Sequence, residues 1–496
     1  MGRAEKSDQG EGRRAGLVAA ALLMAAALPI LFWHLGTPSL YGDEAIYAIA
    51  ARTVAGTGTH LGPGGNALPL ATPGLKPPLK ILAQAWLYRL MGQNEFSTRA
   101  LDAVFGLILV FLVFALTRPW LGSGGGLFAA LLLLAARGLV FDHGLRSGNQ
   151  ESALVLTFAA ALGLYGQDVV RGRRERPWLY GLLLGLGMLS KAPIPLVAVG
   201  VMALHGALRA APGARLAVAT HRTPVVAGAL AEALFLPWLA YAVSVRGFGF
   251  LLSYGQGVGR LVTPLDKAHG NPPSLYAEVL WTNFGWWLLL LWPAAAATFR
   301  ARREGKPNSF DWLLLLWLWV AVTLLAFGLS ASRLQWYVYP LFPALACLLA
   351  AGAEALVRVQ PYRSGRLALA ALFALAMAGD LRPALLRAQQ DTKVIDIHRL
   401  ARLVAQRPGA RVWIDPSLRD IGRWIREWDF YYATSVSHRF APAADLDDTS
   451  GCVLLLAPPH PPGDPAWEGR PARVLASAQR PLVVGDACGG LLAADW

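Results

Sequence analysis

Two adjacent carboxylates, Asp43 and Glu44, follow the first long apolar run of the chain and precede an amphipathic stretch, residues 45–55. An acidic pair at this place has two interpretations. It can cap a helix, because carboxylates in a first turn satisfy free amide groups and favour the helix dipole. It can also supply a general base, because a carboxylate at an apolar interface has a raised proton affinity and accepts a proton from a hydroxyl or amine.

A lysine followed by two prolines stands further along the same loop. Lys76, Pro77 and Pro78 precede apolar residues at helical spacing from residue 79 to residue 90, which predicts a helix at the membrane interface. Prolines fit the first turn of a helix, whose free amides and positive dipole suit a phosphate group. The alternative is a lysine that only extends its charge to the membrane surface.

Further charges interrupt apolar runs on the same side of the predicted membrane. A densely polar segment, residues 141–151, contains Arg146 and Glu151, and Lys191 follows the next pair of apolar runs. Loop solvation is the simple explanation for the polar segment. A charge within hydrocarbon costs about 2.5–3.5 kcal/mol on insertion scales, so Lys191 is expected to face a cavity or an anion.

The last candidate cluster opens a late apolar run and contains Arg333 and Tyr337. An arginine among aromatic residues can be an ordinary interfacial belt. Taken together, however, the clusters place two carboxylates, several cations and several aromatic side chains on one membrane face. That combination fits a lipid phosphate and a sugar.

The composition requires a membrane around most of this chain. Of its 496 residues 55% are hydrophobic and 15% charged, and the mean hydropathy is +0.42. The net charge of +14 comes from arginines clustered between apolar runs, as membrane topology requires, so nucleic acid is not expected as a partner. The three cysteines, Cys347, Cys452 and Cys488, lack metal-ligand spacing.

Apolar runs of sufficient length predict about eleven transmembrane helices. Positive residues in alternate loops place the N-terminus in the cytoplasm, and the first run is expected to be a retained helix and not a cleaved signal. The predicted spans are 15–35, 98–117, 122–140, 151–167, 179–190, 192–208, 223–243, 278–299, 311–329, 337–353 and 366–380.

The predicted fold is therefore a polytopic α-helical membrane protein with a small C-terminal α/β extramembrane domain. Residues 1–14 form the cytoplasmic N-terminus, and residues 15–380 form the transmembrane domain, whose first external loop is 36–97. Residues 381–496 alternate helix-like and strand-like stretches, with a helix expected at 394–405 and strands expected at 411–415 and 452–457, and form the external domain. Whether Cys452 pairs with Cys488 there is left open.

The order of the motifs resembles that of GT-C membrane glycosyltransferases, in the group of protein O-mannosyltransferases and lipid A aminoarabinose transferases. The resemblance covers roughly residues 15–355 and depends on the ordered combination, which no single motif would supply. The motifs that carry it are Asp43-Glu44, Lys76-Pro77-Pro78-Leu79, Ser190-Lys191, and Arg333 with Tyr337 and Pro340.

The resemblance implies inverting transfer of a sugar from a polyprenyl-phosphate donor. It assigns the role of base to Asp43, with Glu44 as its neighbour. It also implies that Lys76 contacts the carrier phosphate and that Arg333 and Tyr337 lie near the same phosphate.

Other positions match the group less closely. Lys191 corresponds to a recurrent lysine, and we add Arg146 and Glu151 as candidates for substrate binding because they share its membrane face. Ile46 and Leu75 stand where aminoarabinose transferases typically carry an arginine and an acidic metal-binding residue. No cofactor is therefore required, a divalent metal is left open, and the sugar need not be aminoarabinose.

We therefore expect a glycosyltransferase in the bacterial inner membrane, with its site on the periplasmic or extracellular face. Its expected partners are the bilayer, a polyprenyl-phosphate sugar and an acceptor that is a lipid, a glycan or a protein. The main alternative is a transporter or lipid flippase, which would place polar residues near the bilayer midplane and show inverted repeats. A second is a receptor or assembly factor whose external domain binds a partner.

Overall fold

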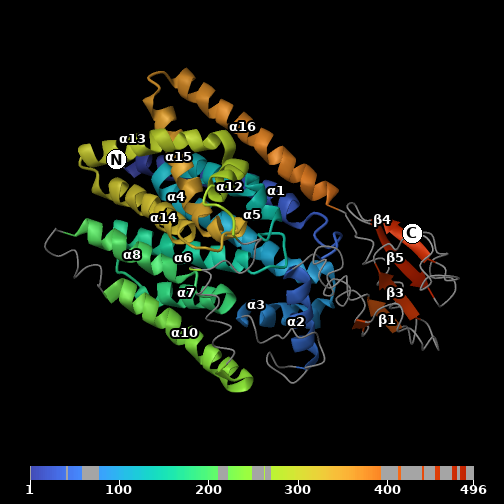
Figure 1. Cartoon of the computed structure of the whole chain (residues 1–496). Coiled ribbons are helices and arrows are strands. Elements are labelled where there is room, and N and C mark those ends of the chain that lie inside the picture. The colour runs from blue at the N-terminus through green and yellow to red at the C-terminus, as the bar shows by residue number, and fades with distance from the viewer. Residues whose placement is uncertain are drawn as a thin grey trace.

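The computed structural model describes residues 2–40, 43–57, 77–210, 222–248, 262 and 270–391, and five strands beyond them. Its helices form a bundle, with α2 and α3 toward the end opposite the N-terminus (Figure 1). The helices are α1 Gly2–Phe32, α2 Asp43–Thr57, α3 Leu79–Met91, α4 Glu95–Ala135, α5 Arg137–Phe141, α6 Glu151–Val170, α7 Pro177–Lys191, α8 Leu196–Arg209, α10 Arg222–Arg246, α12 Leu275–Phe284, α13 Leu291–Arg303, α14 Pro307–Gly328, α15 Phe342–Val359 and α16 Arg363–Gln390, with 3₁₀ turns η4 Gly285–Leu290 and η5 Gln335–Leu341.

Every predicted span overlaps one of these helices. Among the described residues, eight helical stretches are long and apolar enough to cross a membrane. Helix α4 contains the predicted span 98–117 and most of the span 122–140, and it is kinked at Gly122, where φ is 71° and ψ is −177°. Helices α7 and α8 are shorter. The polytopic helical fold is thus confirmed, while the number of spans stays a prediction.

The core of the bundle is built around α15, whose residues from Phe342 to Ala353 are all buried. Small residues bring neighbouring helices close together. A Cβ atom on Gly185 would lie 2.5 Å from Leu234 Cδ1, and one on Gly181 would lie 2.8 Å from the Ala227 carbonyl oxygen. Glycines on one face of α7 therefore let α10 pack against it, as small residues commonly do between membrane helices.

Five strands follow the bundle and form one mixed sheet. They are β1 Arg411–Ile414, β2 His438–Phe440, β3 Val453–Ala457, β4 Ala472–Ala476 and β5 Pro481–Asp486, in the order β2-β1-β3-β5-β4. Strand β1 pairs in parallel with β2 and β3, and β5 pairs antiparallel with β3 and β4. Strands predicted at 411–415 and 452–457 overlap β1 and β3.

The last helix of the bundle is longer than the last predicted span. Helix α16 continues to Gln390, past the end at residue 380 that the hydropathy suggested. The predicted helix at 394–405 and two of the cysteines, Cys452 and Cys488, lie outside the described residues. The division into domains and the pairing of these cysteines stay predictions.

Candidate active site

Helix α2 begins with the acidic pair, so Asp43 and Glu44 lie in its first turn. The Glu44 carboxylate is buried and accepts two hydrogen bonds from Arg99 on α4, at 3.0 Å from Nε to Oε1 and 2.8 Å from Nη2 to Oε2. The Gly148 amide donates to the same Oε1 at 2.7 Å. These contacts tie α2 both to α4 and to the link between α5 and α6.

The Arg99 guanidinium also holds the chain that leads from α1 to α2. It donates to the carbonyl oxygens of Leu35, Pro38 and Ser39 at 3.1, 2.8 and 3.0 Å. Asp43 is partly buried, and no hydrogen bond or ion pair engages its side chain within the described residues. Its position is thus fixed through the neighbouring glutamate, while its own carboxylate remains available.

A second buried ion pair lies beside the first. Lys80 Nζ on α3 is 2.8 Å from Asp102 Oδ2 on α4, and the two side chains are 2% and 0% exposed. The Ser152 hydroxyl on α6 donates to Asp102 Oδ1. Three helices therefore meet at one carboxylate.

A third pair joins α6 to α7. Lys191 Nζ forms an ion pair with Glu151, whose other carboxylate oxygen accepts a hydrogen bond from the Gln150 amide at 3.0 Å. The ammonium also lies 5.7 Å from the centroid of the Tyr337 ring, in a cation–π arrangement. Three residues predicted from separate segments are thus brought together, and the Lys191 side chain remains 25% exposed.

In each of these three ion pairs, one cation neutralises one buried carboxylate. Glu44, Asp102 and Glu151 each have a cationic partner, as buried charges require. Asp43 is adjacent in sequence to one of these paired carboxylates and has no such partner among the described residues. Among the described residues, it is therefore the one of these four acidic side chains that can take up a proton without breaking an ion pair.

Arg146 mainly binds the end of α1. Its Nη1 and Nη2 donate to the Ile30 and Trp33 carbonyl oxygens, each at 2.7 Å, and Nη2 lies 3.6 Å from an Asp391 carboxylate oxygen. Burial lowers the Arg146 pKa to about 10, against the opposing effect of Asp391. The side chain is therefore still charged at neutral pH. Its predicted part in substrate binding stays a prediction.

Arg333 likewise contacts backbone. Its Nε and Nη2 donate to the Gly328 carbonyl oxygen at 3.2 and 3.1 Å, and Nη1 donates to that of Asn271 at 2.8 Å. A parallel β-bridge joins Arg333 to Gly270. The arginine thus connects the end of α14 with the chain before α12, and its predicted phosphate contact is untested. Lys76 lies outside the described residues.

Aromatic side chains border the 141–151 segment. The His143 ring stacks on Trp336, with centroids 3.7 Å apart and planes inclined by 16°. The Tyr339 hydroxyl donates to the Asp142 carbonyl oxygen at 2.9 Å. The aromatic residues of η5 therefore contact the 141–151 segment, which a simple interfacial belt would not require.

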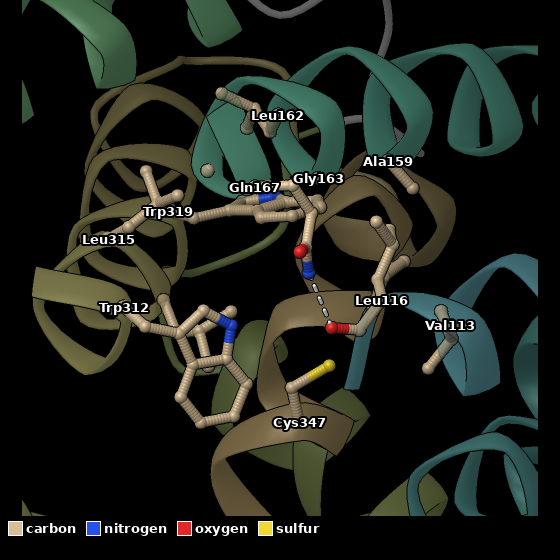
Figure 2. A pocket seen from close by; sticks show the side chains of 13 residues that line it. Val113, Leu116, Ala159, Leu162, Gly163, Gln167, Trp312, Leu315, Trp319 and Cys347 are labelled. Atoms are coloured by element: carbon tan, nitrogen blue, oxygen red, sulfur yellow. Dashed lines mark hydrogen bonds between the residues drawn. The ribbon is translucent and has the colours of Figure 1, made fainter. Parts of the chain in front are cut away.

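A small apolar cavity lies elsewhere, between α4, α6, α14 and α15. Its volume is about 30 Å³, and Figure 2 shows Trp312, Trp319 and Cys347 around it, with the Gln167 amide donating to the Leu116 carbonyl oxygen at 2.9 Å. That volume suits one or two waters and not a sugar. Its lining residues on α6 run from Ala159 to Gln167, about 12 to 24 Å from the start of the helix at 1.5 Å per residue. This cavity is therefore separate from the three ion pairs, Glu44–Arg99, Asp102–Lys80 and Glu151–Lys191.

Within the described part of the chain, no three His, Cys, Asp or Glu side chains gather as a metal site would need. Three of the four carboxylates of the cluster already have cationic partners. A metal site of that composition is therefore absent from the described residues, and dependence on a divalent metal stays open.

The chain resembles known membrane transferases in sequence. Residues 75–241 match the family model described as dolichyl-phosphate-mannose-protein mannosyltransferase. The undecaprenyl phosphate-alpha-4-amino-4-deoxy-L-arabinose arabinosyl transferase 1 of Sodalis glossinidius is 30% identical over 358 residues, which are 69% of this chain and 59% of that protein. The chain thus spans about three fifths of the length of this relative.

Solved structures decide the fold. The crystal structure of ArnT from Cupriavidus metallidurans bound to undecaprenyl phosphate has a TM-score of 0.66 and 17% identity, over 95% of this chain and 98% of that one. This chain has the GT-C glycosyltransferase fold. The GT-C fold extends to the oligosaccharyltransferase of Archaeoglobus fulgidus, with a TM-score of 0.56 and 13% identity over 86% of this chain and 64% of that one. The resemblance inferred from the motifs is confirmed.

Part of this candidate site was not predicted from the sequence. Lys80, Arg99, Asp102 and Ser152 were not among the candidates, yet each forms a buried polar contact. A signal was present, because the predicted span 98–117 contains two charged residues. Charges within a span are costly unless paired, and this rule points to both the arginine and the aspartate.

Proposed function

We propose that this chain transfers a sugar from a polyprenyl-phosphate donor to an acceptor on the external face of the bacterial inner membrane, inverting the anomeric carbon. The observation that carries the proposal is the contrast between Asp43 and Glu44. Glu44 is held by Arg99, whereas Asp43, at the same helix start, has no partner among the described residues. A fixed backbone with a free carboxylate suits a general base.

The reaction breaks the bond between the anomeric carbon and the phosphate oxygen, and it forms a bond from that carbon to an acceptor oxygen or nitrogen. The acceptor proton passes to the Asp43 carboxylate. The phosphate leaves with an additional negative charge, which fixed cations stabilise in the transition state. Lys76 and Arg333 are the cations proposed for this task, and Tyr337 is the aromatic residue proposed to lie near the same phosphate.

Lys191 is well suited to assist. One of its three donor hydrogens serves Glu151, and the partial exposure of its side chain leaves room for an anion. Its place over the Tyr337 ring limits the orientations that the ammonium can adopt. Glu151 therefore acts in this proposal by orienting Lys191. Arg146 connects the polar 141–151 segment to the end of α1.

The relatives suggest the donor and the acceptor. The name of the Sodalis relative specifies undecaprenyl phosphate carrying 4-amino-4-deoxy-L-arabinose, and the Cupriavidus structure contains undecaprenyl phosphate. We propose an undecaprenyl-phosphate sugar as donor and an external lipid as acceptor. Ion pairs at helix ends fit this reaction better than they fit a transport path near the bilayer midplane.

The proposal is tested with the purified chain in lipid nanodiscs. The donors are undecaprenyl phosphates that carry 4-amino-4-deoxyarabinose, mannose or galactose, and the acceptor is lipid A or total membrane lipid. Mass spectrometry measures free undecaprenyl phosphate and any glycosylated lipid. We expect acceptor-dependent release from at least one donor. Release from none of them, by folded protein, would contradict the proposed function with these donors.

A further inference from the structure

The chain that enters α6 contacts all three buried ion pairs of the site. The Gly148 amide donates to the Glu44 carboxylate at 2.7 Å. The Ser152 hydroxyl donates to the Asp102 carboxylate, and Glu151 is itself the acidic member of the third pair. This short segment is therefore where the three pairs are connected.

The backbone of the segment is fixed at both ends. At Gly148 the packing is close, because a Cβ atom there would lie 2.8 Å from Thr98 Cγ2. At the other end, the Gln150 amide donates to Glu151 Oε2 at 3.0 Å, and the Gln150 carbonyl oxygen accepts from the Leu154 amide at 3.3 Å. The second of these bonds belongs to the first turn of α6, so the residues in between have a defined position.

Asn149 and Gln150 lie between these two anchors, and they are only 3% and 2% exposed. The Asn149 Nδ2 atom donates to Ser147 Oγ at 3.2 Å. Its Oδ1 atom, and both Oε1 and Nε2 of Gln150, have no hydrogen-bond partner among the described residues. Buried polar groups without a hydrogen bond are unfavourable and uncommon in folded proteins. Three such atoms in two consecutive residues therefore indicate a place for a polar ligand.

The chemistry of the three atoms suits a hydroxyl group. Asn149 Oδ1 and Gln150 Oε1 are acceptors, and Gln150 Nε2 is a donor. A hydroxyl both donates and accepts hydrogen bonds, so it can use acceptor and donor together. An ionised phosphate only accepts and would face two oxygen atoms, whereas an ammonium only donates and would leave Nε2 unpaired. The ligand expected here is therefore a neutral group with hydroxyls.

The neighbours of the two amides indicate which molecule carries these hydroxyls. Gly148 precedes the amides and contacts Glu44, which adjoins the proposed base Asp43. Glu151 follows them and pairs with Lys191, which is proposed to help stabilise the leaving phosphate. In an inverting transfer, the sugar lies between the base and the leaving phosphate, because the acceptor attacks the face opposite the departing oxygen. The amides thus stand between contacts to the two groups that flank the sugar.

We propose that Asn149 and Gln150 bind ring hydroxyl groups of the donor sugar and so contribute to the choice of sugar. The inference rests on the proposed function, which supplies the donor. A bound sugar completes the hydrogen bonds that the two amides lack. Because their unpaired atoms are buried, a neighbouring side chain must move aside when the sugar enters. Lys191, whose side chain is 25% exposed, has the freedom to do so.

Competition binding tests the inference without any need for turnover. The full chain in mixed micelles binds tritiated undecaprenyl phosphate. The competitors are unlabelled undecaprenyl phosphate and undecaprenyl phosphates that carry mannose, galactose or 4-amino-4-deoxyarabinose. Unfolding curves in the same micelles measure the stability of each variant.

The variants are Gln150→Leu and Gln150→Met, which replace the amide by apolar groups of similar size. Gln167→Leu is the matched control, because Gln167 lies on the same helix, about 25 Å further along it. Unlike that of Gln150, its amide has a partner, the Leu116 carbonyl oxygen at 2.9 Å.

We expect the native chain to bind at least one sugar-bearing lipid about 10-fold more tightly than undecaprenyl phosphate, the scale of one or two neutral hydrogen bonds. Both Gln150 variants should lose this preference and keep the native affinity for undecaprenyl phosphate. They should unfold no more readily than the native chain, because they remove a buried amide that has no partner. Gln167→Leu should be less stable and should keep the preference.

Two results would overturn the inference alone. In the first, the native chain prefers a sugar-bearing lipid and both folded Gln150 variants keep that preference. In the second, both variants lose stability as Gln167→Leu does and also lose affinity for undecaprenyl phosphate, which would give the Gln150 amide a structural role. A native chain with no preference for any of the three sugars would instead contradict the proposed donors, and the inference with them.

Discussion

The Arg99 guanidinium donates two parallel hydrogen bonds, of 3.0 and 2.8 Å, to the Glu44 carboxylate, although the two residues are 55 positions apart in the sequence. Both side chains are more than nine-tenths buried. Bidentate pairs of this kind fix orientation as well as distance. The first turn of α2 is therefore set by Glu44, and the chemistry proposed for this turn belongs to the adjacent Asp43.

Glu44→Gln should destabilise the protein, because it leaves the Arg99 charge buried without a counter-charge. Loss of one partner of a buried pair typically costs about 3–5 kcal/mol in free energy of unfolding. Unfolding in mixed micelles measures the change, with Glu278→Gln, an exposed carboxylate, as control. Equal stability of the two variants would mean that the pair does not anchor α2.

The Lys80–Asp102 pair should show strong thermodynamic coupling. Lys80→Met and Asp102→Leu should each destabilise the chain by about 3–5 kcal/mol, because each strands one buried charge. The double variant should recover most of this loss, since it removes both charges together. The same unfolding assay gives the coupling energy. Additive losses would show that the two groups act independently.

Lys191→Gln should lower kcat/KM for the donor by about 10²-fold, the usual scale for loss of one group that stabilises transition-state charge. Steady-state release of undecaprenyl phosphate measures this change. Arg387→Gln is the control, because its half-exposed pair with Asp142 is expected to contribute less than about 1 kcal/mol to stability. If both substitutions lowered kcat/KM only slightly and to a similar extent, Lys191 would have no part in donor binding or catalysis.

Glu151→Gln should reduce donor turnover less than Lys191→Gln does. The amide keeps a hydrogen-bond acceptor for the Lys191 ammonium but no longer balances its charge. The expected result is a change mainly in kcat, with stability reduced because Lys191 loses its counter-ion. A fall in kcat/KM larger than that of Lys191→Gln would instead indicate that Glu151 contacts the reacting groups.

Hydropathy predicted the bundle well because each span carries its own signal, independent of its neighbours. It did not show how far α16 continues beyond its apolar run, to the turn where Arg387 pairs with Asp142. Motif order correctly grouped the chain with GT-C enzymes. The hydrogen-bond partners of the charged side chains were not predictable. Whether Arg146 binds a substrate or the Ile30 carbonyl oxygen depends on segments that are distant in sequence.

The buried polar face of α3 could not be predicted from the sequence for the same reason. The amphipathic pattern of α3 predicted an interfacial helix, but it did not show which face turns inward. That depends on Asp102, which lies on another helix and offers Lys80 a buried counter-charge. A single sequence gives the periodicity of a helix, whereas its orientation is decided by partners that only the fold brings together.

The role of Asp43 as general base is tested by a single-turnover comparison of Asp43→Asn with Glu278→Gln, both in nanodiscs with saturating donor and acceptor. The rate of undecaprenyl phosphate release is measured, and unfolding curves confirm that both variants are folded. If Asp43 is the general base, Asp43→Asn should retain native stability and lose at least about 10²-fold in rate, the scale of general-base catalysis, while Glu278→Gln keeps the native rate. A folded Asp43→Asn protein that releases undecaprenyl phosphate as fast as the native chain would show that Asp43 is not the base.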